Sequence, residues 1–272
     1  MVDKIYNEDC KQTLRNFIDR GIEVDCILIS PPYNTSQKKH TERSLTNFEN
    51  RYDVYIDSLS NSEYYEWINS LFCDFDKVLK KNGVILWNIS YSTDTYNLGD
   101  DTLETPWVSI AEIIRNTPFT VADKIIWKKL SALPNNSSSN KLTRICEDVF
   151  VFCRKSEIRT FFCNKGLSGV GSNGQKYYKN IFNMVKAPNN DGANPYNKAT
   201  YSSGLCTQLL DLYCPENGLV YDPFMGTGTT AVACVKTDRH YIGSELSSNQ
   251  VKYGEDRVSA IRKEMESIFD LL

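Results

Sequence analysis

A Ser-Pro-Pro-Tyr motif follows directly on an apolar segment in the first part of the chain. Residues 24–29 read VDCILI, which is typical of a buried strand, and Ser30-Pro31-Pro32-Tyr33 comes next. The two prolines fix an extended backbone and remove two N–H donors, so the carbonyls beside them are left to accept hydrogen bonds from another group. For this motif alone, a rigid turn without chemistry remains an equal alternative.

The chemistry that suits such a motif is activation of an amino group on a nucleic-acid base. The lone pair of that nitrogen is delocalised into the ring, which makes it a poor nucleophile. Acceptors aimed at its two hydrogens, such as a carbonyl and the Ser30 hydroxyl, draw the nitrogen toward a tetrahedral form that can attack a sulfonium methyl. Tyr33 offers an aromatic face on which a base rotated out of a duplex can stack.

A second candidate site lies near the other end of the chain. Residues 218–230 read GLVYDPFMGTGTT, which predicts a strand ending in Asp222, a turn at Gly226 and Gly228, and a helix from Thr229. Glycines let the backbone approach a ligand, and a helix N-terminus presents free N–H groups. A further strand ends in Glu245, which is placed to accept from ribose hydroxyls. The turn lacks the Gly-Lys-Ser/Thr of a P-loop and the G-x-G-x-x-G of nicotinamide enzymes.

The elements that position these motifs alternate between strand-like and helical patterns, which predicts an α/β fold with a mostly parallel sheet. Strands are expected within six segments: 24–29, 84–88, 124–127, 148–152, 219–222 and 241–243. A helix is expected over 61–80, with Ser62 as its N-cap and Gly83 just past its end. A second apolar stripe, from Val251 to Leu272, predicts a closing helix whose apolar face packs on the core.

Composition excludes several classes of protein. The net charge of −3 argues against wholesale coating of nucleic acid but is compatible with a local basic face. Nine cysteines without a C-x-x-C pair, together with two histidines, support neither a zinc cluster nor a disulfide framework, so no metal is predicted. No segment approaches the ~20 apolar residues of a membrane helix. A cytoplasmic location with no membrane contact is expected.

The two motifs together resemble a known enzyme family. Ser30-Pro31-Pro32-Tyr33 is similar to the catalytic motif of the amino-methylating DNA methyltransferases, and the segment DPFMGTGTT at 222–230 is similar to their cofactor motif. The catalytic motif comes first here, an order similar to the circularly permuted β group of the family. The resemblance implies a Rossmann-like S-adenosylmethionine-dependent fold with a mostly parallel seven-stranded sheet, helices on both faces and a small target-recognition insertion. It also implies S-adenosylmethionine as cofactor and double-stranded DNA as substrate.

Particular cofactor contacts are implied by the same resemblance. Glu245 would take the ribose hydroxyls, and Asp9 with Cys10 would lie against the adenine. The segment KATYSS at 198–203 occupies the place of the family's methionine-binding motif but departs from its usual letters. The cofactor-binding residues expected are Asp9, Cys10, Thr200, Ser202, Asp222, Pro223, Phe224, Gly226, Gly228, Thr229 and Glu245.

The target base is expected to be cytosine, methylated at N4, because cytosine enzymes of the family mostly have Ser at the first position of the motif, where Ser30 stands. Adenine N6 is the alternative. RNA or protein glutamine methyltransferases also use Pro-Pro-Tyr, but with the cofactor motif first. A catalytically inactive DNA-binding protein and a nicotinamide oxidoreductase are more distant alternatives.

DNA contacts are expected from two segments. Residues 1–154 and 199–272 would form the catalytic and cofactor-binding domain, and 155–198 the target-recognition segment; the loop 34–60 would close over the flipped base. The DNA-binding residues expected are Lys38, Lys39, Arg43, Lys165, Lys176 and Lys179. The resemblance also suggests a homodimer and a cognate restriction endonuclease as partners, and no residue pattern points independently to either.

Overall fold

The computed structural model describes residues 2–32, 34, 59–89, 104–132, 134, 136, 139–140, 142–192, 196 and 200–269. The helices within these ranges are α1 (Cys10–Arg20), α2 (Asn61–Val78), α3 (Glu104–Asn116), α4 (Ser203–Tyr213), α5 (Thr229–Lys236), α6 (Ser248–Phe269) and the short 3-10 helix η1 (Lys155–Glu157). The strands are β1 (Lys4–Tyr6), β2 (Val24–Ile29), β3 (Leu79–Ile89), β4 (Phe119–Lys129), β5 (Cys146–Arg154), β6 (Leu167–Val170), β7 (Lys176–Tyr178), β8 (Met184–Ala187), β9 (Leu219–Asp222) and β10 (His240–Ser244).

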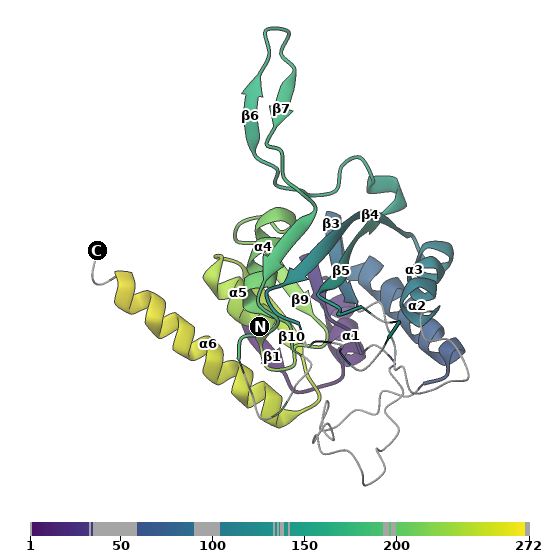
Figure 1. Ribbon diagram of the computed structural model, residues 1–272. Helices are drawn as coiled ribbons and strands as arrows, with labels where there is room; N and C mark the ends of the chain where they lie inside the picture. Colours follow the sequence, from purple (N-terminus) through teal and green to yellow (C-terminus); the bar gives the residue numbers. More distant parts are fainter. Residues whose placement is uncertain are drawn as a thin grey trace.

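One large sheet forms the centre of the molecule (Figure 1). Its strand order is β1-β10-β9-β2-β3-β5-β4-β8, and only β5 runs antiparallel to its neighbours. The prediction of a mostly parallel sheet is confirmed, but the expected count of seven strands is wrong because the sheet has eight. The edge strand β8 accounts for part of this difference: it pairs in parallel with β4 and lies in a segment without a long apolar run.

All six strands expected from the sequence are present, and most extend further than the apolar run that revealed them. The strand expected at 124–127 spans Phe119–Lys129, and the one expected at 148–152 spans Cys146–Arg154. Two strands of the main sheet were not anticipated, namely β1 and β8, with three and four residues. β1 and β8 lie at the two edges of the sheet and alternate exposed with buried residues, so neither has the continuous apolar run that marks the equally short β9.

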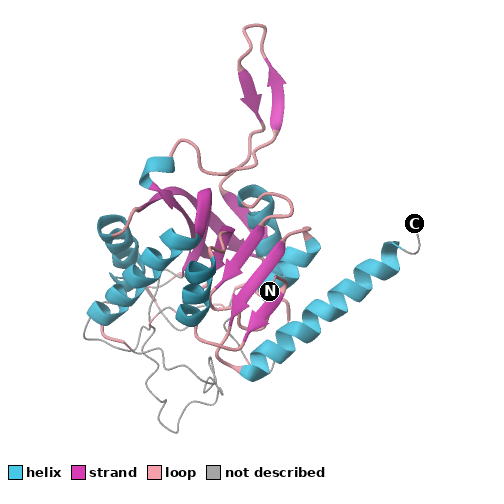
Figure 2. Cartoon of the chain, turned by 180° about the vertical axis from the view of Figure 1, so that it is seen from behind, coloured by secondary structure: helices cyan, strands magenta, loops and turns pink. Residues whose placement is uncertain are grey.

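Helices cover both faces of the sheet, as expected (Figures 1 and 2). Alternate residues of β2 separate the two cores: Cys26 and Leu28 pack with α4, α5 and α6, whereas Ile27 and Ile29 pack with α1, α2 and α3. This period of two is what a strand buried on both faces requires. The sheet is thereby held rigidly, and its strand ends can position functional groups.

The boundaries of α2 differ from the sequence-based prediction. The N-cap is Ser60 rather than Ser62, because Ser60 and Glu63 satisfy each other's backbone N–H groups in a capping box. The helix ends at Val78, and Gly83 lies inside β3 rather than after a helix. A Cβ at Gly83 would be only 2.8 Å from the Asp25 carbonyl oxygen, so this glycine allows β2 and β3 to approach each other.

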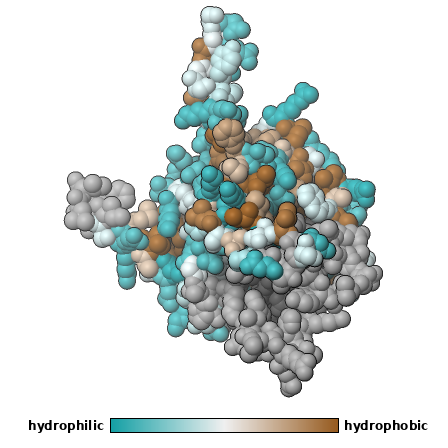
Figure 3. Space-filling view, viewed as in Figure 1, coloured by the Kyte–Doolittle hydropathy of each residue, from teal (hydrophilic) through white to brown (hydrophobic). Residues whose placement is uncertain are grey.

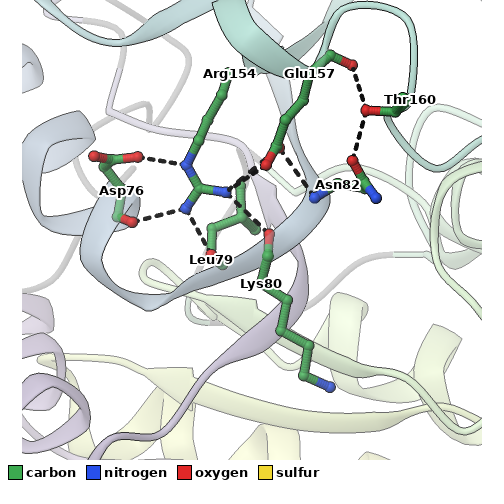
Figure 4. Close-up of polar contacts among 7 residues, drawn as sticks. All are labelled: Asp76, Leu79, Lys80, Asn82, Arg154, Glu157 and Thr160. Atoms are coloured by element: carbon green, nitrogen blue, oxygen red, sulfur yellow. Dashed lines mark hydrogen bonds and ion pairs between the residues drawn. The ribbon is translucent and has the colours of Figure 1, made fainter.

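A hairpin of β6 and β7 projects from the body (Figures 1 and 3). The chain leaves the sheet for this hairpin after Arg154, whose guanidinium bonds the carboxylate and carbonyl of Asp76 and the carbonyls of Leu79 and Lys80 (Figure 4). Glu157 pairs with Arg154 and accepts from the Asn82 N–H at 3.0 Å. These contacts satisfy carbonyls at the end of α2 and fasten the base of the projecting segment.

The described residues contain neither a membrane-spanning helix nor a cluster of side chains that could hold a metal ion. None of the helices there is long and apolar enough to span a bilayer. Within the same ranges, no group of three or more His, Cys, Asp or Glu side chains is arranged to hold a metal ion.

Candidate active site

The carboxyl ends of five parallel strands meet at one edge of the sheet. The register pairs Tyr6 with Ser244 and Gly243 with Asp222, so β1, β10 and β9 end side by side. Next to them, β2 pairs with both β9 and β3, and Ile29 lies opposite Trp87. The Ser-Pro-Pro motif, which follows β2, therefore lies beside the turn that follows β9. In an open α/β sheet this edge is where ligands bind.

The Ser30 side chain is oriented by the neighbouring strand. Its hydroxyl donates to Oδ1 of Asn88 over 3.4 Å, and Ser30 is half-buried. The Asn88 side chain is 1% exposed, and its amide nitrogen donates to the Asp148 carbonyl at 3.2 Å and to Glu147 Oε2 at 3.4 Å. Because its N–H groups are directed at β5, Asn88 turns its oxygen toward Ser30. The Ser30 oxygen, having donated its hydrogen, retains lone pairs that can accept from a substrate.

A charged pair supports this arrangement from behind. Lys129 Nζ lies 2.5 Å from Glu147 Oε1, and the ammonium lies 4.8 Å from the centroid of the Trp127 ring. Both charged side chains are largely covered, with 22% and 16% exposed. Glu147 therefore uses one oxygen for Lys129 and the other for Asn88, which fixes the amide orientation that Ser30 meets.

The two proline carbonyls behave differently from each other. Both were expected to accept from other groups, and for Pro32 that group is within the chain, because its oxygen accepts from the buried Tyr64 hydroxyl at 2.7 Å. In the described part of the chain, no group donates to the Pro31 carbonyl. After the motif, Asn34 adopts a positive φ of 54° and exchanges two 2.8 Å hydrogen bonds with the Leu59 backbone. Tyr33, the last residue of the motif, lies outside the described residues.

The glycine turn after β9 has the shape expected of a nucleotide-binding loop. Gly226 and Gly228 have φ values of 54° and 80°, in the region that glycine adopts most readily. Gly228 is the N-cap of α5 and supplies no side chain to satisfy its first N–H groups. Glu245 Oε2 accepts from the Gly226 N–H at 2.9 Å, and its Oε1 accepts from the Ser247 N–H at 2.9 Å. The carboxylate is thus held at the rim of the loop.

Asp222 is buried at the start of this turn. Its Oδ1 accepts from the Phe224 N–H at 2.9 Å, and its Oδ2 accepts from the Thr230 hydroxyl at 2.5 Å and from the Tyr201 hydroxyl at 3.2 Å. Burial raises the pKa of Asp222 to about 6, and the three donors oppose that shift. Tyr201 was not expected to take part; its place between Thr200 and Ser202 in the KATYSS segment was the available signal.

The remaining residues expected to bind the cofactor divide into two groups. Asp9 and Cys10 do lie at this edge: Asp9 caps α1, and the Cys10 carbonyl accepts from the Tyr221 hydroxyl at 3.3 Å. Burial raises the pKa of the Cys10 thiol to about 12, so it stays neutral and offers an apolar surface. Phe224 packs 5.7 Å from Trp67 of α2, measured between ring centroids.

The hydroxyl groups expected at the cofactor have other uses. Ser202 is fully buried, and its oxygen caps α4 by accepting from the Leu205 N–H at 3.2 Å. The Thr229 hydroxyl accepts from Arg257 at 3.2 Å. Pro223 is buried within the turn, and Thr200 lies half-buried just before Tyr201.

The basic residues expected to bind DNA are not brought to this edge. Lys165, Lys176 and Lys179 lie on the projecting hairpin and its base, which leave the sheet at the opposite edge because β5 runs antiparallel. Six residues of β3 separate Asn82 at that edge from Asn88 beside Ser30, a span of about 20 Å. The other expected contacts, Lys38, Lys39 and Arg43, lie outside the described residues.

This site fits S-adenosylmethionine by the chemistry of its groups. The glycine turn and the N-terminus of α5 supply N–H groups, Glu245 supplies a carboxylate for hydroxyls, and Phe224 with Cys10 supplies apolar surface. Such a cofactor would supply an electrophilic methyl group at the edge that also holds Ser30. The fold and site define a Rossmann-like methyltransferase whose acceptor motif and cofactor turn lie on adjacent strands.

Comparison with known sequences agrees. Residues 24–256 match the profile of the DNA methylase family of N6 and N4 amino-methyltransferases. The chain belongs to this family and is an S-adenosylmethionine-dependent DNA methyltransferase.

Individual relatives resemble this chain along nearly its whole length. The type II methyltransferase M2.MboI of Moraxella bovis is 25% identical, over 97% of this chain and 90% of the relative. M.HinfI of Haemophilus influenzae is 23% identical, over 96% of this chain and 69% of the relative.

Two solved structures share the fold. The M1.HpyAVI-SAM complex superimposes with a TM-score of 0.60 at 20% identity, covering 94% of this chain and 98% of that one. The cytosine-N4-specific PvuII DNA methyltransferase has a TM-score of 0.67 at 17% identity, covering 93% and 85%. At these identities the structures support the fold alone.

Proposed function

We propose that this enzyme methylates the exocyclic amino group of a base rotated out of double-stranded DNA, with N4 of cytosine favoured over N6 of adenine. The observation that carries the proposal is that Ser30 and Pro31, which offer a hydroxyl and a carbonyl as acceptors, directly follow β2, the strand that pairs with β9 and so lies beside the cofactor turn. Together they can hold both hydrogens of an amino group while its lone pair points at the methyl donor. No covalent bond from enzyme to base is needed.

The roles of the chain's own residues follow from this geometry. Asn88 accepts from the Ser30 hydroxyl and would orient it, and Glu147 accepts from the Asn88 amide. Tyr64 holds the Pro32 carbonyl and so fixes the backbone that presents Pro31. Tyr33 would stack on the base. S-adenosylmethionine, when bound, would supply the methyl group as its S–CH3 bond breaks and its sulfonium becomes a thioether. The amino nitrogen would lose one proton, which would pass to water.

Support for cytosine comes from the serine at the first position of the motif. Adenine N6 is the second candidate, since a carbonyl and a hydroxyl can accept from either amino group. The chain order, with the acceptor strand before the cofactor strand, supports assignment to the permuted β group. The type II relatives support a place in a restriction-modification system, with a cognate endonuclease as partner.

The experiment that tests this proposal is a nucleoside analysis. Purified protein would be incubated with S-adenosylmethionine and unmethylated duplex DNA, and the digested DNA examined by mass spectrometry. N4-methylcytosine is the expected product, and its loss in Ser30→Ala but not in Ser259→Ala, a change on the exposed part of α6, would tie it to the motif. N6-methyladenine would overturn the choice of base. Absence of any methylated nucleoside, with cofactor binding intact, would overturn duplex DNA as the substrate.

We further propose that the segment 155–198 contacts the duplex during target recognition. Between Ile158 and Asn190 the chain carries five basic residues and no acidic one, although the net charge of the whole chain is −3. Tyr177 and Tyr178 of the hairpin are each more than half exposed. A two-stranded ribbon fits the major groove of B-form DNA.

The position of the hairpin has a consequence for this contact. Its base lies about 20 Å from Ser30 along β3 and the hairpin projects beyond that point (Figure 1), so its contact with the duplex would lie away from the flipped base. Deletion of residues 165–180 should abolish sequence-specific methylation and leave cofactor binding intact. Retained methylation at the native sequence would exclude this segment from recognition.

A further inference from the structure

The cofactor turn is held from outside by α6. The backbones of the two elements are in close contact, since a Cβ on Gly228 would lie 2.8 Å from the Gly254 Cα. One helical turn further on, the Arg257 guanidinium donates to the Thr227 carbonyl at 2.7 Å and to the Thr229 hydroxyl at 3.2 Å. Both threonines are buried, with 1% and 4% exposed. Arg257 therefore bonds both residues that flank Gly228.

The same guanidinium reaches a second segment of the cofactor site. Its other terminal nitrogen lies 2.6 Å from Oδ2 of Asp191, in the segment that precedes α4. Oδ1 of Asp191 accepts from the N–H of Ser203 at 2.8 Å and from its hydroxyl at 3.0 Å. Asp191 thus links Arg257 to the first turn of α4, close in sequence to Tyr201, whose hydroxyl donates to Asp222.

A second contact from α6 reinforces this link. The ring of Tyr253 meets that of Tyr196 edge to face, with centroids 5.7 Å apart. Tyr253 and Arg257 are four residues apart and so share one face of α6. This face of α6 therefore contacts both the cofactor turn and the segment that precedes α4.

An exposed ion pair is ordinarily worth little, because water screens it. This one differs because the two side chains are only 20% and 25% exposed, although Asp191 as a whole residue is exposed, and because Arg257 also bonds the Thr227 carbonyl and Asp191 the Ser203 N–H. Arginine suits the task because its planar group can serve a carboxylate and a carbonyl at fixed angles.

We propose that Arg257, together with Asp191, is a positioning residue that holds the glycine turn in its cofactor-binding shape. The proposal rests on the assignment of that turn to S-adenosylmethionine. Without the clamp, the turn would have to be ordered when the ligand binds, which lowers affinity. Arg257 acts on the turn rather than on the reacting atoms, so its loss weakens ground-state and transition-state binding equally.

The test compares Arg257→Met with Arg262→Met. Arg262 is the matched control because it also lies on α6 and also forms an ion pair, with Asp3 at 3.4 Å, but forms no hydrogen bond or ion pair with the described residues of the turn. Isothermal titration should show the Kd for S-adenosylmethionine raised about tenfold in R257M and unchanged in R262M. At saturating cofactor, kcat should be retained in both variants.

Hydrogen exchange gives a readout that does not depend on the cofactor. In cofactor-free protein, amides of residues 224–232 should exchange faster in R257M than in the wild type, and R262M should match the wild type. Asp191→Asn provides a second variant, because asparagine retains an acceptor for the Ser203 N–H but loses the charge. It should raise the Kd in the same direction, and the double variant should be little worse than R257M alone.

The outcomes separate this inference from the function on which it rests. Wild-type protein that binds no S-adenosylmethionine would overturn the cofactor assignment and the clamp together. Wild-type binding with an unchanged Kd in R257M and in D191N would overturn the clamp alone. A lowered melting temperature in R257M with wild-type Kd and wild-type exchange at 224–232 would reduce Arg257 to a general stabilising residue, against the proposal.

Discussion

Replacing Gly228 with alanine is expected to damage the cofactor turn in two separate ways. The backbone there has a φ of 80°, a left-handed conformation that costs an alanine about 1–2 kcal/mol. The added Cβ would also lie 2.8 Å from the Gly254 Cα, and backbone cannot move aside as a flexible side chain can. Overpacking of this kind costs about 1–3 kcal/mol. The free energy of unfolding should therefore fall by about 2–5 kcal/mol.

Gly21 offers a control that isolates the first effect. It caps the end of α1 with a φ of 62°, and a Cβ there would meet no atom within 4 Å. Gly21→Ala should therefore lose only the conformational cost of about 1–2 kcal/mol. Because Gly21 lies at the far end of α1 from Cys10, cofactor affinity should be unchanged in this variant.

Urea denaturation measures the stability of both variants, and calorimetric titration measures their affinity for S-adenosylmethionine. G228A should be the less stable of the two and should bind the cofactor at least about tenfold more weakly than the wild type. Equal stability in the two variants would show that α6 shifts to accommodate the added methyl group. Wild-type cofactor affinity in G228A would refute the assignment of this turn to the cofactor.

Four further predictions test other parts of the site. Ser30→Ala should reduce kcat by about a hundredfold or more, measured by methyl transfer to duplex DNA, with an unchanged Kd for the cofactor; unchanged turnover would remove Ser30 from the mechanism. Burial raises the pKa of Asp222 to about 6, above its unfolded value, so the protonated form is favoured by folding and stability should decline as pH rises from about 4 to about 6. Asp222→Asn should lack this pH-dependent part of the free energy of unfolding, which is on the order of 3 kcal/mol, when urea denaturation is measured across that pH range. If stability changed with pH equally in the two proteins, Asp222 would not have the raised pKa. Replacing Lys176 and Lys179 together with alanine should lower the slope of log affinity against log salt concentration by about 2 in DNA-binding assays, whereas an unchanged slope would place both lysines away from phosphates. Arg154→Met should cost about 2–4 kcal/mol of stability, because its bonds to the end of α2 are lost, while cofactor affinity is retained.

Much of the fold and the location of the site could be predicted because the motifs themselves contain the strands that position them. The strands expected at 24–29 and 219–222 are β2 and β9 with the same bounds. Both are short apolar runs followed by a polar residue and a proline, and such runs bounded by turn-forming residues are typical of buried strands. Their adjacency in the sheet then follows from the fold that the resemblance implied.

What escaped prediction depends on contacts between residues far apart in the chain. Tyr201 reaches Asp222 from 21 residues away, and Asn88 meets Ser30 across 58 residues. The closing stripe was correctly assigned to the core at Val251 and Val258, yet nothing in it marked Arg257, which bonds Thr227 across 30 residues. Polar pairings of this kind leave no periodic signal, since each needs only one residue on each side.

The position of Ser202 shows a different limit. A serine before an apolar helical segment can bind a ligand or cap the helix, and the same hydroxyl serves either purpose. Here it accepts from the Leu205 N–H and is fully buried. The sequence could place the residue at the site but could not decide where its lone pairs are used.

The order of strands in the sheet also determines at what point during translation the sheet can be completed. In the described part of the sheet β1 pairs only with β10, and Glu245, which accepts from the Gly226 N–H of the cofactor turn, directly follows β10. At about 5–20 residues per second, the ribosome needs roughly 10–50 s after starting β1 before its partner strand appears. During that interval β2, which leads into the Ser-Pro-Pro-Tyr motif, can form before the cofactor-binding turn is present beside it. A chain that ends before β10 lacks the partner of β1 and the carboxylate of Glu245 beside the cofactor turn, so we expect it to be unable to modify DNA.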